Sequence, residues 1–302
     1  MVSLVILVVC LNLGVLLQKV KTLPNNAHTT LGTLILYVPM PAICLLSLPD
    51  LVWNLSLIPL MLVMWIIFGV GYFLFPYLGK KLNWDKELVG CLILTACFCN
   101  TSFVGFPVID ALYGKEALNH AVFLDQSGSF LIVSSLGIWV AITYSSGKMR
   151  KCILFKKILM FPPFIAFLIG IAGGATGWRP EGVMRDVLEK LASLLTPMAL
   201  ISVGLQLHWN DIHEEIKYLV TGLTFKLLIA PLMIFVIYYF AGIEKTILKV
   251  AVMEAAMAPM VTSSILAASH NLRPRLSGMM VGVGVPLSFV TLAFWYYLLE
   301  FV

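Results

Sequence analysis

One stretch of the chain combines residue types that could recognise a carboxylate, and it lies inside a long apolar run. Asn100, Thr101 and Ser102 are followed by Gly105 and Pro107. Proline removes a backbone donor and glycine loosens a helical turn, so this stretch predicts a broken helix. Within lipid, a break is tolerated where it lines a cavity in the protein. The freed amides and the partial positive charge of a half-helix N-terminus suit an anionic ligand.

A second stretch matches the first when the sequence is compared with itself. The shift that lays Pro39 on Pro197 also carries the first break onto a stretch containing Pro259, Thr262 and Ser263. Two interrupted helices at corresponding positions of two halves indicate a transport site. The alternative interpretation is a pair of proline kinks whose hydroxyl groups bond within their own helices.

Three ionisable side chains, Asp125, Glu254 and Lys226, lie deep within apolar runs. At about 1.5 Å per residue, all three are close to the predicted midplane of the membrane. A lone charge there costs at least about 2.5–3.5 kcal/mol, so we predict an ion-coupling role for each of them. The alternatives for Lys226 are a bridge to an acid that fixes helix packing, or snorkelling of its ammonium group to the interface.

The composition indicates the elements that must position these residues. The chain has 302 residues, of which 60% are hydrophobic and 12% charged, and its mean hydropathy is +0.98. These values exclude a soluble globular domain and a disordered chain. The net charge of +5 is too small and too scattered to suggest a nucleic-acid partner. The six cysteines have neither a disulfide framework nor zinc spacing.

The predicted fold is an all-α membrane protein with ten transmembrane helices. With both termini on the extracytoplasmic side, 13 of the 20 Lys and Arg residues lie on inner loops and six on outer loops, which favours that orientation in a multi-pass cell-membrane protein. The ten apolar runs are 2–18, 29–48, 55–78, 88–109, 117–144, 162–177, 187–207, 216–241, 246–269 and 274–299.

The domain organisation follows from the longest inner connection. The basic linker 145–161 separates a first half, 1–144, from a second half, 162–302, and each half contains five predicted helices. Because five is an odd number, the two halves have opposite orientations in the membrane. We therefore predict two inverted five-helix repeats, a plan that is common among secondary transporters.

The motifs of the chain resemble those of the auxin efflux carrier family, in particular its bacterial members, over essentially the whole length. The Asn…Gly-x-Pro segment is moderately specific, and the other motifs are specific in combination and order. The motifs are the run 34–48 with Pro39 and Pro41, the break 100–107, the triplet 112–114, the segment 226–231 and the break at Pro259.

The resemblance implies a secondary transporter of small organic anions, such as malate, malonate or auxin-like indole acids. Helices 1, 2, 6 and 7 would form a scaffold and a homodimer interface. Helices 3–5 and 8–10 would form a transport domain that moves like an elevator, with broken helices 4 and 9 crossed. The implied partners are the carboxylate substrate and the lipid bilayer. The implied substrate-binding residues are Asn100, Thr101, Ser102, Pro107, Pro259, Thr262 and Ser263.

A more distant similarity concerns the coupling ion. The ninth run, from Glu254 onward, is similar to that of bile-acid sodium symporters, in which the glutamate helps to bind sodium. Glu254 with oxygens near Thr101 and Ser102 would then make a sodium site. The pair Gln-Asn of that family is replaced here by alanine and Pro259, which removes possible ligands. Proton coupling through Glu254 or Asp125 and uncoupled transport are the alternatives, and no other cofactor is expected.

Other function classes fit the sequence less well. An intramembrane metalloprotease needs a His-Glu-x-x-His helix, and the five histidines show no such spacing. A channel would show a selectivity motif or a pore ring. A cation/proton antiporter is the nearer alternative, because it would use the buried acids without a carboxylate-binding Asn100. We therefore expect a transporter rather than an enzyme.

Overall fold

The computed structural model describes residues 2–20, 22–24, 26–49, 57–145, 162–206 and 212–301. These residues form helices and turns without a β-strand, which confirms an all-α fold for the described part of the chain. The predicted linker 145–161 lies outside the described residues from position 146 onward.

The described residues of the first half form α-helices interrupted by three π-helical turns. The π-helical turns are Thr101–Gly105, Asp125–Phe130 and Val133–Gly137. The α-helices are α1 (Val2–Leu17), α2 (Ala27–Tyr37), α3 (Pro39–Ser47), α4 (Ile58–Leu82), α5 (Lys86–Ala96), α6 (Phe106–Leu124) and α7 (Ile138–Tyr144).

The second half has a similar make-up, with a π-helical turn at Phe225–Ile229 between α12 and α13. Its α-helices are α9 (Pro162–Thr176), α10 (Gly182–Ser193), α11 (Leu195–Gln206), α12 (Ile212–Thr224), α13 (Ala230–Phe240), α14 (Lys245–Ala255), α15 (Val261–Ser269) and α16 (Pro274–Glu300).

Within the described residues, four helical segments are long and apolar enough to cross a membrane: 58–82, 116–144, 215–240 and 274–300. Each begins and ends within a few residues of a predicted apolar run. Segments of 25 to 29 residues exceed the roughly 20 residues that a bilayer requires. The structure thus confirms membrane-spanning helices, while the count of ten and the inverted repeat remain predictions.

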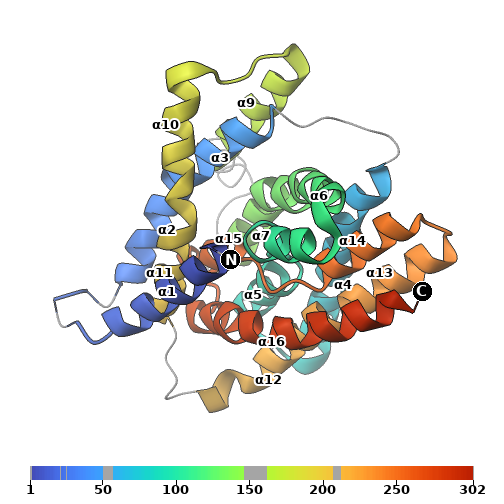
Figure 1. Cartoon of the computed structure of the whole chain (residues 1–302). Coiled ribbons are helices and arrows are strands. Elements are labelled where there is room, and N and C mark those ends of the chain that lie inside the picture. Colours follow the sequence, from blue (N-terminus) through green and yellow to red (C-terminus); the bar gives the residue numbers. More distant parts are fainter. Residues whose placement is uncertain are drawn as a thin grey trace.

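The helices gather in two groups (Figure 1). In the first group α1 packs against α11, α3 against α9 and α10, and α2 against α11. In the second group α5 packs against α4, α7 and α15, and α14 packs against α13 and α6. The two groups meet where α15 contacts α2 and α11, and where α16 contacts α11. The interrupted helices therefore lie next to the first group.

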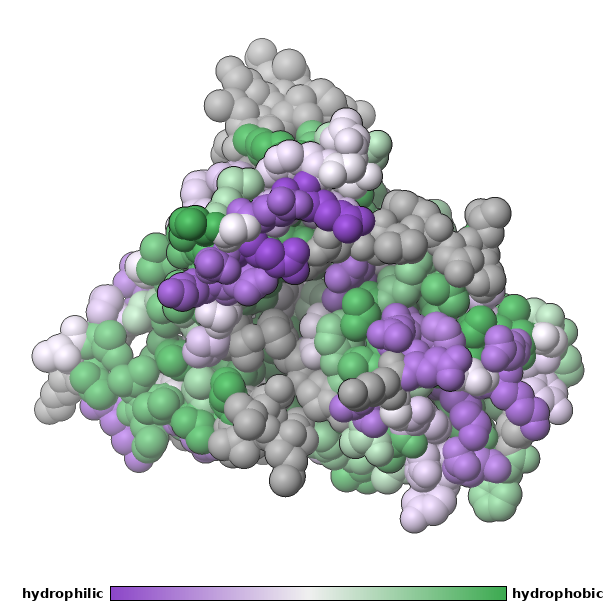
Figure 2. Space-filling model, turned by 45° about the horizontal axis from the view of Figure 1, so that its top comes forward, coloured by the Kyte–Doolittle hydropathy of each residue, from purple (hydrophilic) through white to green (hydrophobic). Residues whose placement is uncertain are grey.

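The surface of the protein is largely apolar. Figure 2 shows hydrophobic residues spread over much of the visible face, with hydrophilic residues gathered in a few areas. Large apolar side chains such as Phe73, Phe240 and Val290 are 75%, 82% and 67% exposed. Exposed apolar surface on this scale is what a lipid-facing protein presents, and it is rare in soluble monomers. The buried core lies between the helices, as at the edge-to-face rings of Phe75 and Phe225.

The predicted run 187–207 begins in the middle of one helix and continues into the next, so it is not a single helix. The structure has two helices there, α10 and α11, which join at Leu194. α10 buries none of its residues, and Arg185 donates to Glu189 one turn later at 2.9 Å. Because charges at helical spacing keep this face in water, α10 is an amphipathic helix rather than part of a continuous apolar span.

Two further interruptions were not predicted. The second predicted run, 29–48, is divided at Val38, where α2 ends and α3 begins with Pro39. Gly114, within α6, has a φ of 77°, so the helix is interrupted there. Only glycine adopts this left-handed conformation without steric cost.

A polar cluster fixes the start of α5. The carboxylate of Asp85 caps the helix by accepting from the Leu88 N–H at 2.7 Å, and it also accepts from Arg273. Arg273 donates in addition to Glu215 at 2.9 Å. Partial burial favours the neutral acid, but the hydrogen bonds from Arg273 and Leu88 outweigh it and hold the pKa of Asp85 below its usual value. The cluster joins α5, α12 and the loop before α16.

We predict that Asp85→Ala lowers the thermal unfolding midpoint of the purified protein in detergent. Loss of a helix cap costs about 0.5–2 kcal/mol, and Arg273 also loses a partner. Because the pKa is held low, the contribution is present at neutral pH and is lost as the pH falls through the lowered value. Glu189→Ala is the control, since its exposed pair contributes about 0.2–1 kcal/mol. Equal shifts in the two variants would contradict the prediction.

Candidate functional site

The two predicted breaks meet each other in the structure. α5 ends at Ala96 and α14 ends at Ala255, and the extended segments that follow pair through an antiparallel bridge between Cys99 and Pro259. The Asn100 N–H donates to the Ala258 carbonyl at 2.8 Å, and the Met260 N–H donates to the Phe98 carbonyl at 3.1 Å. Each break therefore satisfies backbone groups of the other, as the interior of a membrane requires.

Proline suits its place in this pairing. The two hydrogen bonds of the bridge are donated by Asn100, which follows Cys99, and by Met260, which follows Pro259. Because neither bond uses the N–H that proline lacks, Pro259 costs no hydrogen bond here. Gly284 of α16 lies directly against the Pro259 ring, because a Cβ there would come within 2.7 Å of the proline Cδ. The absence of a side chain at Gly284 allows α16 to pack directly against the crossing at Pro259.

The helices resume differently on the two sides of the crossing. After Asn100 the chain forms the π-helical turn Thr101–Gly105, and Pro107 lies in the first turn of α6, where its missing N–H is not needed. The side chain of Pro107 lies outside what the structure describes. On the other side α15 begins at Val261, so Thr262 and Ser263 occupy its first turn.

The hydroxyl groups of this first turn have separate partners. Ser263 donates to the Met260 carbonyl at 3.0 Å, while Ser264 shares a hydrogen bond with Ser277 of α16 at 2.7 Å. Thr262 instead lines a cavity beside the crossing. Of the two predicted hydroxyl residues, Thr262 therefore faces the cavity and Ser263 is bound to its own helix.

Asp125 is held by the first break. Its Oδ1 accepts hydrogen bonds from Thr101 and, at 2.8 Å, from Ser102. Thr101 also lies 3.3 Å from the Ser129 hydroxyl, one turn further along the same π-helical segment. Asp125 is buried. The hydroxyl groups of the break thus stabilise a carboxyl group on the neighbouring helix.

Glu254, in the last turn of α14, is the second buried acid near the crossing. Its side chain is fully buried, and neither carboxylate oxygen has a hydrogen-bond partner among the described residues. It packs against the backbone of Gly105, where a Cβ would come within 2.5 Å of Oε2. The two acids predicted for ion coupling are therefore in different environments, one bonded to hydroxyl groups and one without donors.

Lys226 reaches the crossing from the π-helical turn between α12 and α13. Its side chain is fully buried, and its Nζ donates to the Ala255 carbonyl at 2.7 Å and to the Cys99 Sγ at 2.8 Å. Within the described residues no acid pairs with it, so neither the expected bridge to an acid nor snorkelling describes its position.

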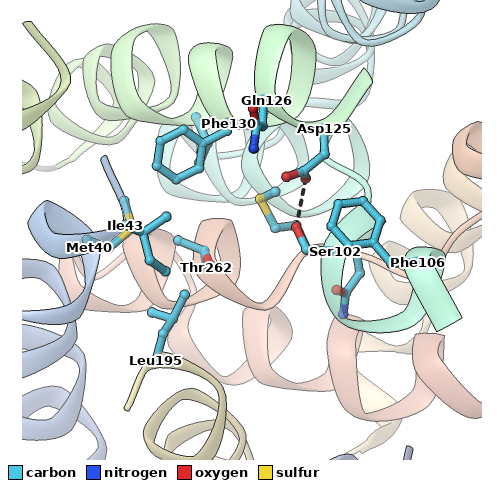
Figure 3. Close-up of a pocket in the computed structure, with 12 residues that line it drawn as sticks. Met40, Ile43, Ser102, Phe106, Asp125, Gln126, Phe130, Leu195 and Thr262 are labelled. Atoms are coloured by element: carbon cyan, nitrogen blue, oxygen red, sulfur yellow. Dashed lines mark hydrogen bonds between the residues drawn. The ribbon is translucent and has the colours of Figure 1, made fainter. Parts of the chain in front are cut away.

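A cavity of about 220 Å³ lies beside the crossing (Figure 3). Asp125, Gln126 and Phe130 project toward it from one helical segment, and Met40 and Ile43 approach from α3. Asn100, Ser102, Phe106, Val133, Leu195, Met260 and Thr262 complete the lining. The apolar contributions of α3, α11 and Phe130 were not predicted, because nothing in an apolar run shows which side faces a cavity.

The hydroxyl groups expected to join Glu254 around sodium are hydrogen-bonded to another carboxyl group. Thr101 and Ser102 donate to Asp125, whereas Glu254 faces Gly105. The Ala255 carbonyl accepts from Lys226 and, at 3.8 Å, from the Cys99 thiol, and sulfur is a poor ligand for a hard cation. Nor does the described part of the chain contain a group of three or more His, Cys, Asp or Glu side chains that could hold a metal. The residues present do not fit the implied sodium ion.

Comparison with known proteins agrees with this architecture. The family model for "Membrane transport protein" matches residues 1–296. An uncharacterized transporter of Methanothermobacter thermautotrophicus is 30% identical over 94% of this chain and 93% of its own. One from Methanocaldococcus jannaschii is 25% identical over 98% of this chain and 97% of its own. Auxin efflux carrier component 8 of Arabidopsis thaliana is 23% identical over 74% of this chain and 73% of its own. The chain therefore belongs to the auxin efflux carrier family of membrane transport proteins.

Proposed function

We propose that this transporter is a secondary carrier of small organic anions, which bind through a carboxylate beside the crossing. The observation that supports the proposal is the pairing of two broken helices at Cys99 and Pro259 next to a cavity lined from both groups of helices. The Arabidopsis relative is an auxin efflux carrier component, which supports the same class of substrate.

A carboxylate suits the polar groups at the cavity. Asn100 offers an amide, and Thr262 lies in the first turn of α15, where the helix N-terminus carries partial positive charge. No lysine or arginine lines the cavity among the described residues. Recognition would therefore depend on amide groups and on the helix dipole, which stabilise a negative charge without a side-chain cation.

Alternating access is proposed to follow from the two groups of helices. Met40 and Ile43 of α3 and Leu195 of α11 line the cavity from the predicted scaffold, whereas the other lining residues belong to the predicted transport domain. A sliding motion of one group past the other would carry a substrate bound at the crossing across the membrane. We also propose that the carrier is a homodimer and that both termini lie on the extracytoplasmic side.

The coupling proposal concerns Asp125, which lines the cavity. An ionised Asp125 would repel a substrate carboxylate in the same cavity, and a protonated Asp125 would not. Its bonds with Thr101 and Ser102 could hold either form, since hydroxyl groups both donate and accept. Proton-coupled uptake through Asp125 is therefore the favoured form of coupling.

The second candidate is a cation/proton antiporter. The observation that favours it is the presence of two buried acids, Asp125 and Glu254, near the crossing. The two candidates differ in a simple measurement on proteoliposomes. An anion carrier exchanges labelled carboxylate against unlabelled carboxylate, whereas an antiporter moves protons in response to cations without any organic anion.

We predict that Asn100→Ala reduces carboxylate counterflow by about 10–100-fold, because a hydrogen bond to a charged ligand is lost. The measurement uses proteoliposomes and labelled malate, malonate and indole-3-acetate, each tested separately. Asn119→Ala is the matched control, since Asn119 is exposed on α6. Wild-type counterflow in a folded Asn100→Ala protein would contradict the proposed role.

Asp125→Asn is expected to retain counterflow and to lose its pH dependence, because an amide cannot take up the coupling proton. Wild-type counterflow should become faster as the external pH falls from neutral. The exposed Asp186→Asn variant should behave like the wild type. If the pH dependence survives unchanged in Asp125→Asn, the coupling proton is not carried by this residue.

A further inference from the structure

Lys226 brings its side-chain ammonium group to the crossing of the broken helices. Its ammonium group has no exposed surface and donates to one carbonyl and one thiol, those of Ala255 and Cys99. Both acceptors belong to the crossing: Ala255 is the last residue of α14, and Cys99 forms the bridge with Pro259. The charge therefore lies at the point where the two breaks pair.

The local fold holds Lys226 in this position. It is part of the π-helical turn Phe225–Ile229, whose Leu227 carbonyl accepts from the indole N–H of Trp295 on α16 at 2.9 Å. The ring of Phe225 packs edge-to-face on Phe75 of α4 at 5.2 Å. Contacts with Trp295 of α16 and Phe75 of α4 thus fix the turn, and the fixed turn directs the side chain of Lys226 to the crossing.

The position itself attracts a cation. α14 ends at Ala255, so the carbonyl that Lys226 contacts lies at the negative end of a half-helix dipole. In transporters with broken helices, such unwound carbonyls and half-helix C-termini are where a coupling cation is held. Here the ammonium group of the protein supplies the positive charge at that end.

We propose that the Lys226 ammonium is the built-in cation of this carrier, holding the place at the C-terminus of α14 that a monovalent ion would otherwise occupy. The proposal rests on the function proposed above and adds that transport proceeds without bound sodium. It agrees with the hydrogen bonds of Thr101 and Ser102 to Asp125, because a site that already contains a cation does not need these hydroxyl groups as ligands.

The first experiment uses the wild-type protein. Carboxylate counterflow in proteoliposomes is measured in sodium, potassium and N-methylglucamine buffers of equal ionic strength, and binding of labelled sodium to purified protein is measured in parallel. We expect equal counterflow in the three buffers and no saturable sodium binding. Counterflow that requires sodium, or saturable sodium binding by the wild type, would overturn the proposal.

The second experiment removes the cation. Lys226→Ala leaves space beside the Ala255 carbonyl, whereas Lys226→Met fills that space without charge. We expect both variants to lose thermal stability, because the Ala255 carbonyl loses a charged donor. Their counterflow should be slower than that of the wild type by a factor of about ten or more. Methylammonium should restore the midpoint and the counterflow of Lys226→Ala but not of Lys226→Met. Lys249→Ala, which removes an exposed ion pair with Glu300, is the control.

The outcomes separate this inference from the proposed function. If no tested carboxylate supports counterflow in the wild type, the proposed function fails, while sodium binding and the thermal midpoints still test Lys226. If the wild type shows counterflow but methylammonium has the same effect on Lys226→Ala, Lys226→Met and Lys249→Ala, the ammonium group of Lys226 is not the cation of the crossing. A variant that does not fold leaves the wild-type sodium measurements as the deciding result.

Discussion

Backbone groups buried within a membrane must find partners inside the protein, and the whole site depends on how this chain meets that requirement. Two helices stop near the middle of the fold, and the amide and carbonyl groups that they release bond to each other around Cys99 and Pro259. Because each break satisfies the other, both can persist without lipid reaching a free amide. The close approach of Gly284 behind Pro259 supports the pair.

The same arrangement separates charge. The first turn of α15 presents a positive helix end toward the cavity that Thr262 lines, and the last turn of α14 presents a negative end toward Lys226. An anion and a cation are thus favoured at different points of one crossing. Of the two buried acids, Asp125 lines the cavity and Glu254 packs against Gly105.

The long spans and the two breaks could be predicted from the sequence, because apolar runs and proline are local signals. The partners of the buried charges could not be predicted, since they depend on how helices rotate against one another. Thr101 and Ser102 bond to Asp125, a partner that the sequence did not indicate. Lys226 contacts residues 29 and 127 positions away, and no spacing within an apolar run encodes such a contact.

The most direct test of the account is a cross-link between the two breaks. Residues 99 and 259 face each other across an antiparallel bridge, where Cα atoms lie about 4.5–5.5 Å apart, within the range of a disulfide. Pro259→Cys is oxidised with a membrane-permeant reagent and the linked peptides are identified by mass spectrometry, with Pro259→Cys in a Cys99→Ala background as the control. The account predicts a disulfide joining Cys99 to the new cysteine. Free thiols at both positions, or a link to another cysteine, would contradict the crossing.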